Sequence, residues 1–499
     1  MSNAPQLMKN TLLLAASSIA LRLCALCFQA YLAAKVGAQE LGVFGIIASV
    51  GVVFATVSIS GVRFGVTRLA AEEISRGNKF PHTLMRCAFS YAAFFGCLAG
   101  AVMFFGAPFL SRHWVMQISA TPPLKIMALS MPLIALGSCA EGYFTAKQKI
   151  FRLVISEVFA QAARIVFVVF SFNVHKNFSS ADVLAKGFFA AESALSVSLL
   201  FLYAFESFGK KESGKKKKHF KNLVGTALPL AISAYMRTGL SSLGQIIIPR
   251  GLRKAGMGVA SAFSTYGVIG QMSMPVIMFP AALLTALGEI LVPRLTSAQV
   301  QKQKIGISYI VNRALRIGII FSFGVAGVML FYSNELGEAL YKSSEAGLYI
   351  KIFAPLLPII YIDCVTDGCL KGLGQQVYSM VFNVLEGVLN VVMLFFLLPK
   401  MAIMGYIVVM YIKEIFNAAL SMHRLSKVTS VDINIMMMLC VGGGVWGAWM
   451  INAIVAASFC LAAKLCTYCI FYVALIYIIN AITRDDIRWV VSLTNPKKI

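Results

Sequence analysis

Among the arginines inside long apolar runs of this sequence are Arg164, which we expect to form a structural ion pair, and the candidate binding residues Arg22, Arg63 and Arg237. A charge at the centre of a membrane-spanning helix costs about 2.5–3.5 kcal/mol, so such residues usually face a cavity or a partner. The planar guanidinium fork binds phosphate oxygens in pairs. We therefore expect the three candidate binding residues to line a cavity that binds an anionic group. The alternative for Arg22 and Arg237 is a structural ion pair between helices, and Arg63 is shallow enough to extend toward the surface near Arg68.

A second set of charges is acidic and lies in the later part of the chain. Asp363 and Asp367 are four residues apart, which places them on one face of a helix, and Glu386 follows in the next apolar run. Together they are a candidate site for a coupling cation, or the lining of a wet vestibule. Lys413 directly precedes Glu414, and we expect this pair to be structural.

The usual signatures of catalysis are absent from the sequence. It contains no GxxxxGK[ST] phosphate loop, no HExxH motif and no nucleophile elbow. Cys24 and Cys27 are three apart, but no second pair accompanies them, so a zinc site is not expected. We predict a protein that is not an enzyme and that holds neither a metal nor a cofactor.

The composition explains where these charges must lie. Of 499 residues, 59% are hydrophobic and 13% are charged, with a mean hydropathy of +0.79, whereas soluble domains carry about 25% charged residues. The net charge of +24 does not indicate a nucleic-acid partner, because the basic residues gather in short gaps between apolar stretches. The chain is therefore expected to be an all-α polytopic membrane protein.

Fourteen apolar runs are long enough to cross the roughly 30 Å hydrocarbon core. They are 11–34, 41–66, 87–109, 124–146, 153–174, 183–205, 223–248, 259–292, 310–333, 348–370, 377–398, 404–423, 434–456 and 460–482. The eighth run contains Pro275 and Pro280, which predict a kinked or broken helix. When the gaps and the adjoining ends of the runs are assigned to alternate sides, the side holding both termini has 27 Lys and Arg residues and the other side 12. The positive-inside rule then places both termini in the cytoplasm.

The runs divide into two sets of six. We expect an N-lobe at residues 1–205, a cytoplasmic basic linker at 206–222, a C-lobe at 223–424, and two further helices with a cytoplasmic tail at 425–499. Similar junctions end the fourth and tenth runs: Glu141-Gly142 is followed by Gln148, and Asp367-Gly368 by Gln375. Six spans per set give the two sets the same orientation, which predicts a parallel repeat with a substrate site at its interface.

Several stretches, in this order and spacing, resemble the stage V sporulation protein B family of polysaccharide and lipid-linked oligosaccharide transporters. They are LGVF from Leu41, ALPL from Ala227, MPVIMFP from Met274, GLGQQ from Gly372 and GYI from Gly405. The resemblance runs along nearly the whole chain and implies the multidrug/oligosaccharidyl-lipid/polysaccharide exporter superfamily, with two six-helix lobes around a central cavity, two extra helices and alternating access. By this resemblance, Arg237 and Arg22 correspond to arginines that line the cavity in the family. The chain departs from the pattern at Phe28-Gln29, where lipid II flippases have an Arg-Asp pair, and at Arg63, where relatives have proline.

The resemblance implies a flippase that moves an undecaprenyl-pyrophosphate-type oligosaccharide or cell-wall precursor across the cytoplasmic membrane of a bacterial cell. Its expected partners are the lipid-linked glycan, membrane lipids and a coupling Na⁺ or H⁺, with the protein acting as a monomer. One alternative is a cation-coupled multidrug exporter of the same architecture. The other is a scaffold for envelope assembly that transports nothing.

Overall fold

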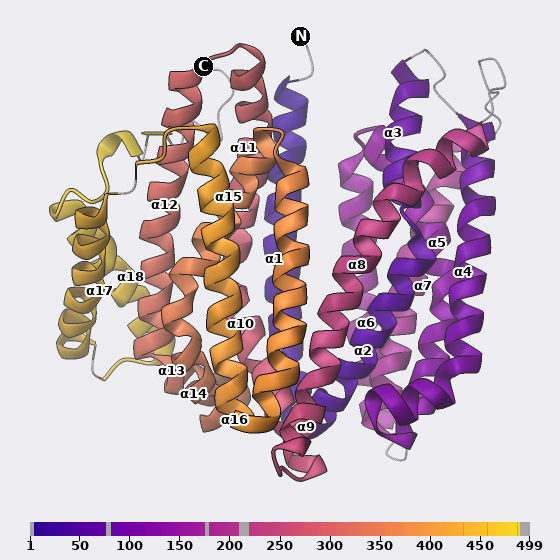
Figure 1. The fold of residues 1–499 in the computed structure, drawn as a ribbon, viewed down its shortest axis with the longest axis horizontal. Helices are drawn as coiled ribbons and strands as arrows, with labels where there is room; N and C mark the ends of the chain where they lie inside the picture. The colour runs from indigo at the N-terminus through magenta and orange to yellow at the C-terminus, as the bar shows by residue number, and fades with distance from the viewer. Residues whose placement is uncertain are drawn as a thin grey trace. The chain divides into compact units, whose positions relative to one another are not determined.

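The computed structural model describes residues 4–75, 81–174, 179–208, 219–432, 434–456, 458–486 and 488–489. These residues form helices joined by turns, and no strand occurs among them (Figure 1). Twelve of the described helical segments are long and apolar enough to cross a membrane. The predicted all-α polytopic fold class is confirmed, whereas the count of fourteen spans stays a prediction.

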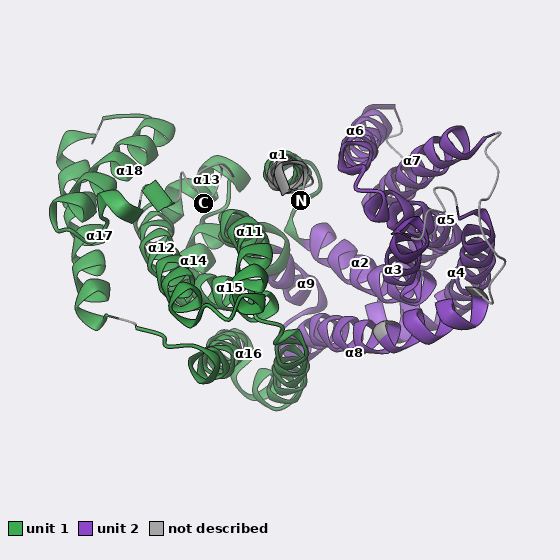
Figure 2. Ribbon diagram, turned by 90° about the horizontal axis from the view of Figure 1, so that it is seen from above, with its two compact units in different colours: residues 1–38, 268–499 green, residues 39–267 purple. Residues whose placement is uncertain are grey.

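Two compact units make up the described chain, coloured separately in Figure 2. One unit, residues 39–267, contains α2 (Ala38–Ile59), α3 (Val62–Ser75), α4 (His82–Leu110), η1 (Ser111–Val115), η2 (Ile118–Ala120), α5 (Thr121–Ala146), α6 (Ile150–Val174), α7 (Ser180–Ser207), α8 (His219–Lys254) and α9 (Val259–Gly267). The other unit, residues 1–38 and 268–499, contains α1 (Ala4–Val36), η3 (Val268–Ser273), α10 (Met274–Met278), α11 (Ala281–Val300), α12 (Lys304–Phe331), α13 (Ser333–Tyr341), α14 (Ser344–Phe353), η4 (Ala354–Leu356), α15 (Leu357–Gly372), α16 (Gln376–Val428), α17 (Ile435–Val455) and α18 (Leu461–Ile478). We call them the 39–267 unit and the 268–499 unit.

The bounds of these units differ from those of the expected lobes. The first helix of each expected six-span set, α1 and α8, is grouped with the helices of the other set. Each unit thus contains the first helix of the other six-span set. The division of the sequence into two repeated lobes stays a prediction. The Lys215–Lys218 run of the expected linker lies outside the described residues.

The eighth apolar run is broken, as its prolines predict. It is divided among α9, the π-helical turn η3, the five-residue α10 and the start of α11. Pro275 stands in the first turn of α10 and Pro280 immediately precedes α11. Proline has no amide hydrogen to donate and its ring crowds the preceding turn, so a helix restarts at such positions more easily than it continues.

The chain reverses direction within α16, at a residue that the apolar pattern alone does not identify. A straight helix of its 53 residues would measure about 80 Å, far more than the hydrocarbon core. Ala402 interrupts it with φ 49° and ψ −127°. A Cβ on Gly405 would lie 2.7 Å from the carbonyl oxygen of Leu397, eight residues earlier, so the chain folds back here. The two expected runs 377–398 and 404–423 are the two halves of this hairpin.

Small residues bring the helices of the 39–267 unit together. Gly61, whose φ is +71°, lies so close to α8 that an added Cβ would stand 2.2 Å from the carbonyl oxygen of Ala227. A Cβ on Gly96 of α4 would lie 2.9 Å from the Cβ of Ala135 in α5. Such close backbone approach is how membrane helices gain packing without a hydrophobic driving force.

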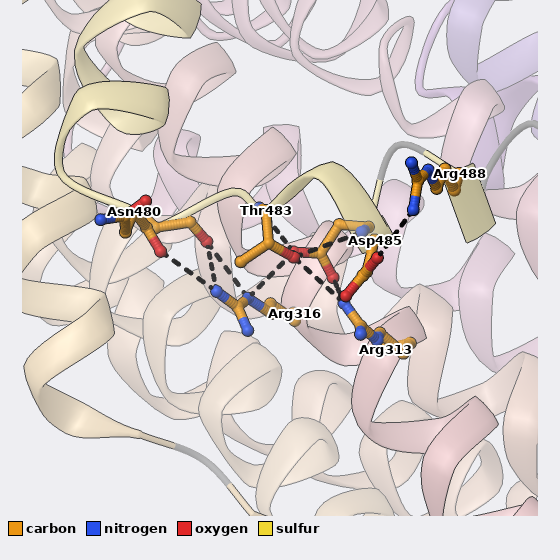
Figure 3. Close-up of polar contacts among 8 residues, drawn as sticks. Arg313, Arg316, Asn480, Thr483, Asp485 and Arg488 are labelled. Carbon is orange, nitrogen blue, oxygen red and sulfur yellow. Dashed lines mark hydrogen bonds and ion pairs between the residues drawn. The ribbon is translucent and has the colours of Figure 1, made fainter.

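In the 268–499 unit, the segment after α18 is fastened to α12 by ion pairs. The carboxylate of Asp486 is fully buried and accepts a hydrogen bond from Arg313, with Arg316 at 3.6 Å. The amide and hydroxyl of Thr483 donate to the same carboxylate at 2.8 and 2.7 Å, and Arg316 also donates to backbone carbonyl oxygens of the segment, that of Ala481 among them (Figure 3). Burial raises the pKa of Asp486, but the hydrogen bonds from Thr483 and Arg313 and the charge of Arg316 lower it more, so its pKa lies below the ordinary range.

Candidate functional site

Arg22 lines a small pocket within the 268–499 unit. The pocket has a volume of about 290 Å³, and its lining residues are Arg22, Ala25, Leu26, Gln29, Gln271, Pro275, Met278 and Phe279. The Nε2 atom of Gln29 in α1 donates to the carbonyl oxygen of Gln271, at 2.9 Å, in the π-helical turn η3. The Arg22 side chain is exposed, and no described residue forms an ion pair with it. A guanidinium, two amide side chains and an unwound turn therefore meet in one apolar pocket.

Arg237 lies on α8 in the 39–267 unit and is also exposed. No carboxylate of the described chain is within ion-pair distance of it. Its neighbours fix the helix that carries it: the hydroxyl of Tyr235 donates to Ser60 at 2.7 Å, and the hydroxyls of Thr56 and Thr238 lie 3.4 Å apart. The backbone of Arg237 is thus anchored while its charge is left available.

Arg63 has a different environment from the other two arginines. It lies on α3 and forms an ion pair with Glu141 of α5 at 2.8 Å. α3 packs against α8, so Arg63 and Arg237 belong to the same unit, whereas Arg22 belongs to the other. Among the described residues, Arg63 has an acidic partner, whereas no carboxylate forms an ion pair with Arg22 or Arg237.

Lys413 joins the two halves of the α16 hairpin. Its ammonium lies 2.7 Å from a carboxylate oxygen of Glu414 and 3.0 Å from one of Glu386, and all three side chains are largely buried. The expected structural pair with Glu414 is confirmed. The position of Glu386 in the expected cation site remains untested, but its carboxylate already has a protein cation beside it.

Asp363 and Asp367 share one face of α15 but have separate partners. Asp367 pairs with Lys371 at 2.5 Å and accepts a hydrogen bond from the hydroxyl of Ser379. Asp363 accepts a hydrogen bond of 2.9 Å from the side-chain amide of Asn417 in α16. The remaining Oδ1 atoms of Asp363 and Asn417 are buried without a hydrogen-bond partner among the described residues. A buried acceptor oxygen without a hydrogen-bond partner can take a proton or act as a ligand of a small cation.

Three amide residues in the Arg22 pocket and beside Asp363 were not predicted from the sequence as site residues. Gln271 and Asn417 were missed entirely, and Gln29 was noted only as a departure from a family pattern. The signal was present in each case, since an amide side chain within an apolar run needs a hydrogen-bond partner. Among the described residues, no group of three or more His, Cys, Asp or Glu side chains is arranged to hold a metal ion.

Comparison with known proteins gives a consistent group of relatives. The profile of the family described as "Polysaccharide biosynthesis protein" matches residues 7–299. Stage V sporulation protein B of Bacillus subtilis (strain 168) is 24% identical over 443 residues, covering 86% of this chain and 85% of the relative. Lipid II flippase MurJ of the same organism is 20% identical over 379 residues, covering 68% of each chain.

Solved structures resemble this fold over most of its length. The inward closed conformation of lipid II flippase MurJ matches with a TM-score of 0.70 at 13% identity, covering 94% of this chain and 98% of the other. An inward-facing multidrug resistance MATE family transporter of the MOP superfamily matches with a TM-score of 0.61 at 13% identity, covering 82% and 95%. At these identities the likeness concerns the fold alone.

Proposed function

We propose that this chain, which belongs to the polysaccharide biosynthesis protein family, is a flippase for a lipid-linked glycan precursor carrying an undecaprenyl-pyrophosphate-type anchor. Its relatives support a transporter or flippase as the general class. The observation that carries the cargo class is the state of Arg22 and Arg237, two exposed guanidinium groups in apolar helices with no acidic partner in the described chain. Burying such a charge is costly, and a pyrophosphate is the group that two guanidinium forks bind well.

The mechanism follows from the chemistry of the cargo. The pyrophosphate and sugar enter an aqueous cavity while the polyprenyl tail stays in lipid, and Arg22 and Arg237 each pair with phosphate oxygens during passage of the headgroup. Alternating access then exposes the headgroup on the outer side. The inward-negative membrane potential favours outward movement of an anion by about 2.3 kcal/mol per charge per 100 mV. In this proposal both termini are cytoplasmic and the protein works as a monomer.

The acidic side chains of the 268–499 unit supply the coupling in this proposal. Asp363 is the centre of the expected cation site, because its Oδ1 and that of Asn417 are buried acceptors without partners. Na⁺ or H⁺ bound at the Asp363 carboxylate would neutralise it and reset the cycle. Asp367 and Glu386 contribute negative potential around that position, since each already pairs with a lysine.

Reconstitution into vesicles tests the proposal. A fluorescent undecaprenyl-pyrophosphate-linked sugar is placed in one leaflet, and its exposure to a quencher on the other side is followed. We expect Arg237→Ala to slow exposure at least about tenfold, because hydrogen bonds to charged groups contribute about 1.5–3 kcal/mol. The matched control is Arg68→Ala, which removes a 70% exposed arginine of the same unit and should leave the rate unchanged. An unchanged rate in Arg237→Ala would refute the arginine-clamp proposal.

A cation-coupled multidrug exporter is the second candidate. The observation that favours it is the buried carboxylate of Asp363, whose Oδ1 has no hydrogen-bond partner among the described residues and can accept a proton or a cationic drug. Expression in a drug-sensitive host distinguishes the two. Protection against cationic dyes that Asp363→Asn abolishes and Arg237→Ala leaves intact would favour the exporter.

A further inference from the structure

The carboxyl end of α8 in the 39–267 unit gathers three basic residues around one pocket. The pocket has a volume of about 510 Å³ and is lined by Met116, Arg250, Arg253, Lys254, Met257, Gly258 and Val259. No carboxylate is among these lining residues. Arg250 and Arg253 are three residues apart on α8, and like charges at this spacing repel each other, so an anion bound beside them would stabilise the helix end.

The arginines of this pocket lack the partners that guanidinium groups prefer. The Nη1 atom of Arg253 donates to the thioether sulfur of Met116 at 3.5 Å, and a thioether is a weak acceptor. Arg250 is partly buried, and no described residue forms an ion pair with it. Two adjacent guanidinium groups thus retain most of their hydrogen-bonding capacity for an oxygen ligand.

Met116, which lines the pocket, and Gly256, which precedes the lining residue Met257, have left-handed backbone conformations. Met116 ends the π-helical turn η1 with φ 60° and ψ 27°, and Gly256 has φ +97°. A non-glycine residue in this region is uncommon and carries strain of about 1–3 kcal/mol. The strained Met116 places its sulfur over Arg253, where an anionic oxygen would bind more strongly.

Helix electrostatics explains only part of this arrangement. Cations in the last helical turn, here Arg253 and Lys254, are stabilised by the negative end of the helix dipole. Arg250 lies before the last helical turn, so the helix dipole does not explain why it lines the same pocket. Under the orientation expected from the basic residues, this end is the outer one, and these three residues are a quarter of the 12 Lys and Arg residues on that side. Basic residues are normally fewer on the outer side, so a cluster of three there departs from the positive-inside rule.

We propose that this pocket, formed by Arg250, Arg253, Lys254 and Met116, binds the phosphoryl group of a membrane lipid. Guanidinium pairs match phosphate oxygens in both charge and geometry, and the apolar Met257 and Val259 suit the first carbons of a lipid chain. The phosphate has two sources, an anionic phospholipid of that leaflet or the polyprenyl phosphate of a glycan carrier. The site goes beyond the proposed function, because it is an equilibrium binding site that requires no transport.

Titration of the purified full chain with inorganic pyrophosphate tests the charge site. The experiment uses an Arg22→Gln/Arg237→Gln background, so that binding at the proposed cargo site does not contribute. Adding Arg250→Gln and Arg253→Gln should weaken the remaining binding at least about tenfold, since the charge-assisted hydrogen bonds of both guanidinium groups are lost. Arg112→Gln, which removes an exposed arginine of the nearby turn η1 that does not line the pocket, is the matched control. Thermal melting checks that all variants are folded.

Equal affinity with and without Arg250 and Arg253, or an equal loss in Arg112→Gln, would overturn the proposal. A second arm identifies the source of the phosphate by native mass spectrometry of the wild-type chain from nanodiscs. One set contains phosphatidylglycerol in phosphatidylcholine, and the other contains undecaprenyl phosphate in phosphatidylcholine. Retention that disappears in Arg250→Gln/Arg253→Gln assigns the site to the lipid retained, whereas no retention of either lipid refutes a lipid ligand. Because neither arm measures transport, failure of the flippase proposal leaves this result interpretable.

Discussion

Two cations in apolar helices, Lys413 in the 268–499 unit and Arg237 in the 39–267 unit, have opposite surroundings. The side chain of Lys413 is 15% exposed, and its ammonium lies within 3.0 Å of two carboxylates. Arg237 is exposed and has no acidic partner in the described chain. Placing a charge in a membrane helix costs free energy. Two carboxylates of the fold offset this cost for Lys413, whereas a ligand or water must offset it for Arg237.

This difference separates charges that hold helices together from charges that are available for binding. Lys413 connects the two halves of α16, and its removal would leave two carboxylates without a cation. Arg63 belongs with Lys413 in this respect, because it pairs with Glu141. The partner of a buried charge, rather than its depth, therefore indicates its role.

The largest effect on stability is expected from Lys413→Met. Removing one member of a buried ion pair costs about 3–5 kcal/mol, because the remaining charges stay buried and unpaired. The melting temperature of the purified chain should fall clearly, whereas Arg237→Gln should leave it nearly unchanged. The triple variant Lys413→Met/Glu386→Gln/Glu414→Gln should recover most of the loss. Equal melting of the two single variants would remove the distinction between the two cations.

A smaller, local effect is expected at Asp486, a fully paired charge at the end of the 268–499 unit. Asp486→Asn should speed hydrogen exchange in residues 479–486 by about 10- to 100-fold, because hydrogen bonds to charged groups contribute about 1.5–3 kcal/mol. Asp485→Asn, at a neighbouring carboxylate that is 68% exposed, is the control.

The same contact gives a defined pH dependence. The pKa of Asp486 is lower in the folded chain than in an unfolded one, where it is about 3.9. Its contribution is therefore complete above that value and is lost as the pH falls through the lower, folded pKa. Protection of residues 479–486 should be constant from pH 5 upward, after correction for intrinsic exchange. Protection that declines between pH 7 and 5 would contradict this assignment.

The smallest effect is expected for the partly exposed pair of Arg63 and Glu141. The Arg63 side chain is 46% exposed, and pairs open to solvent contribute about 0–1 kcal/mol. Arg63→Gln/Glu141→Gln should therefore melt within a few degrees of the wild type. It should also flip the lipid-linked sugar faster than Arg237→Ala does. A transport loss as large as that of Arg237→Ala would place Arg63 among the residues that bind cargo.

The sequence by itself determined the class of protein and the local interruptions of its helices. Apolar composition predicted a helical membrane protein, Pro275 and Pro280 predicted the broken helix, and adjacency predicted the pair of Lys413 and Glu414. These features depend on residues close together in the chain, where hydropathy and backbone chemistry act directly.

Only the tertiary structure decided which charges have partners. Glu386 reaches Lys413 across 27 residues, and Asn417 reaches Asp363 across 54. It also decided that α1 and α8 are grouped with helices of the opposite sequence half. The physical reason is that hydropathy specifies which segments enter the membrane, whereas close packing of small residues and polar contacts between distant helices specify their neighbours.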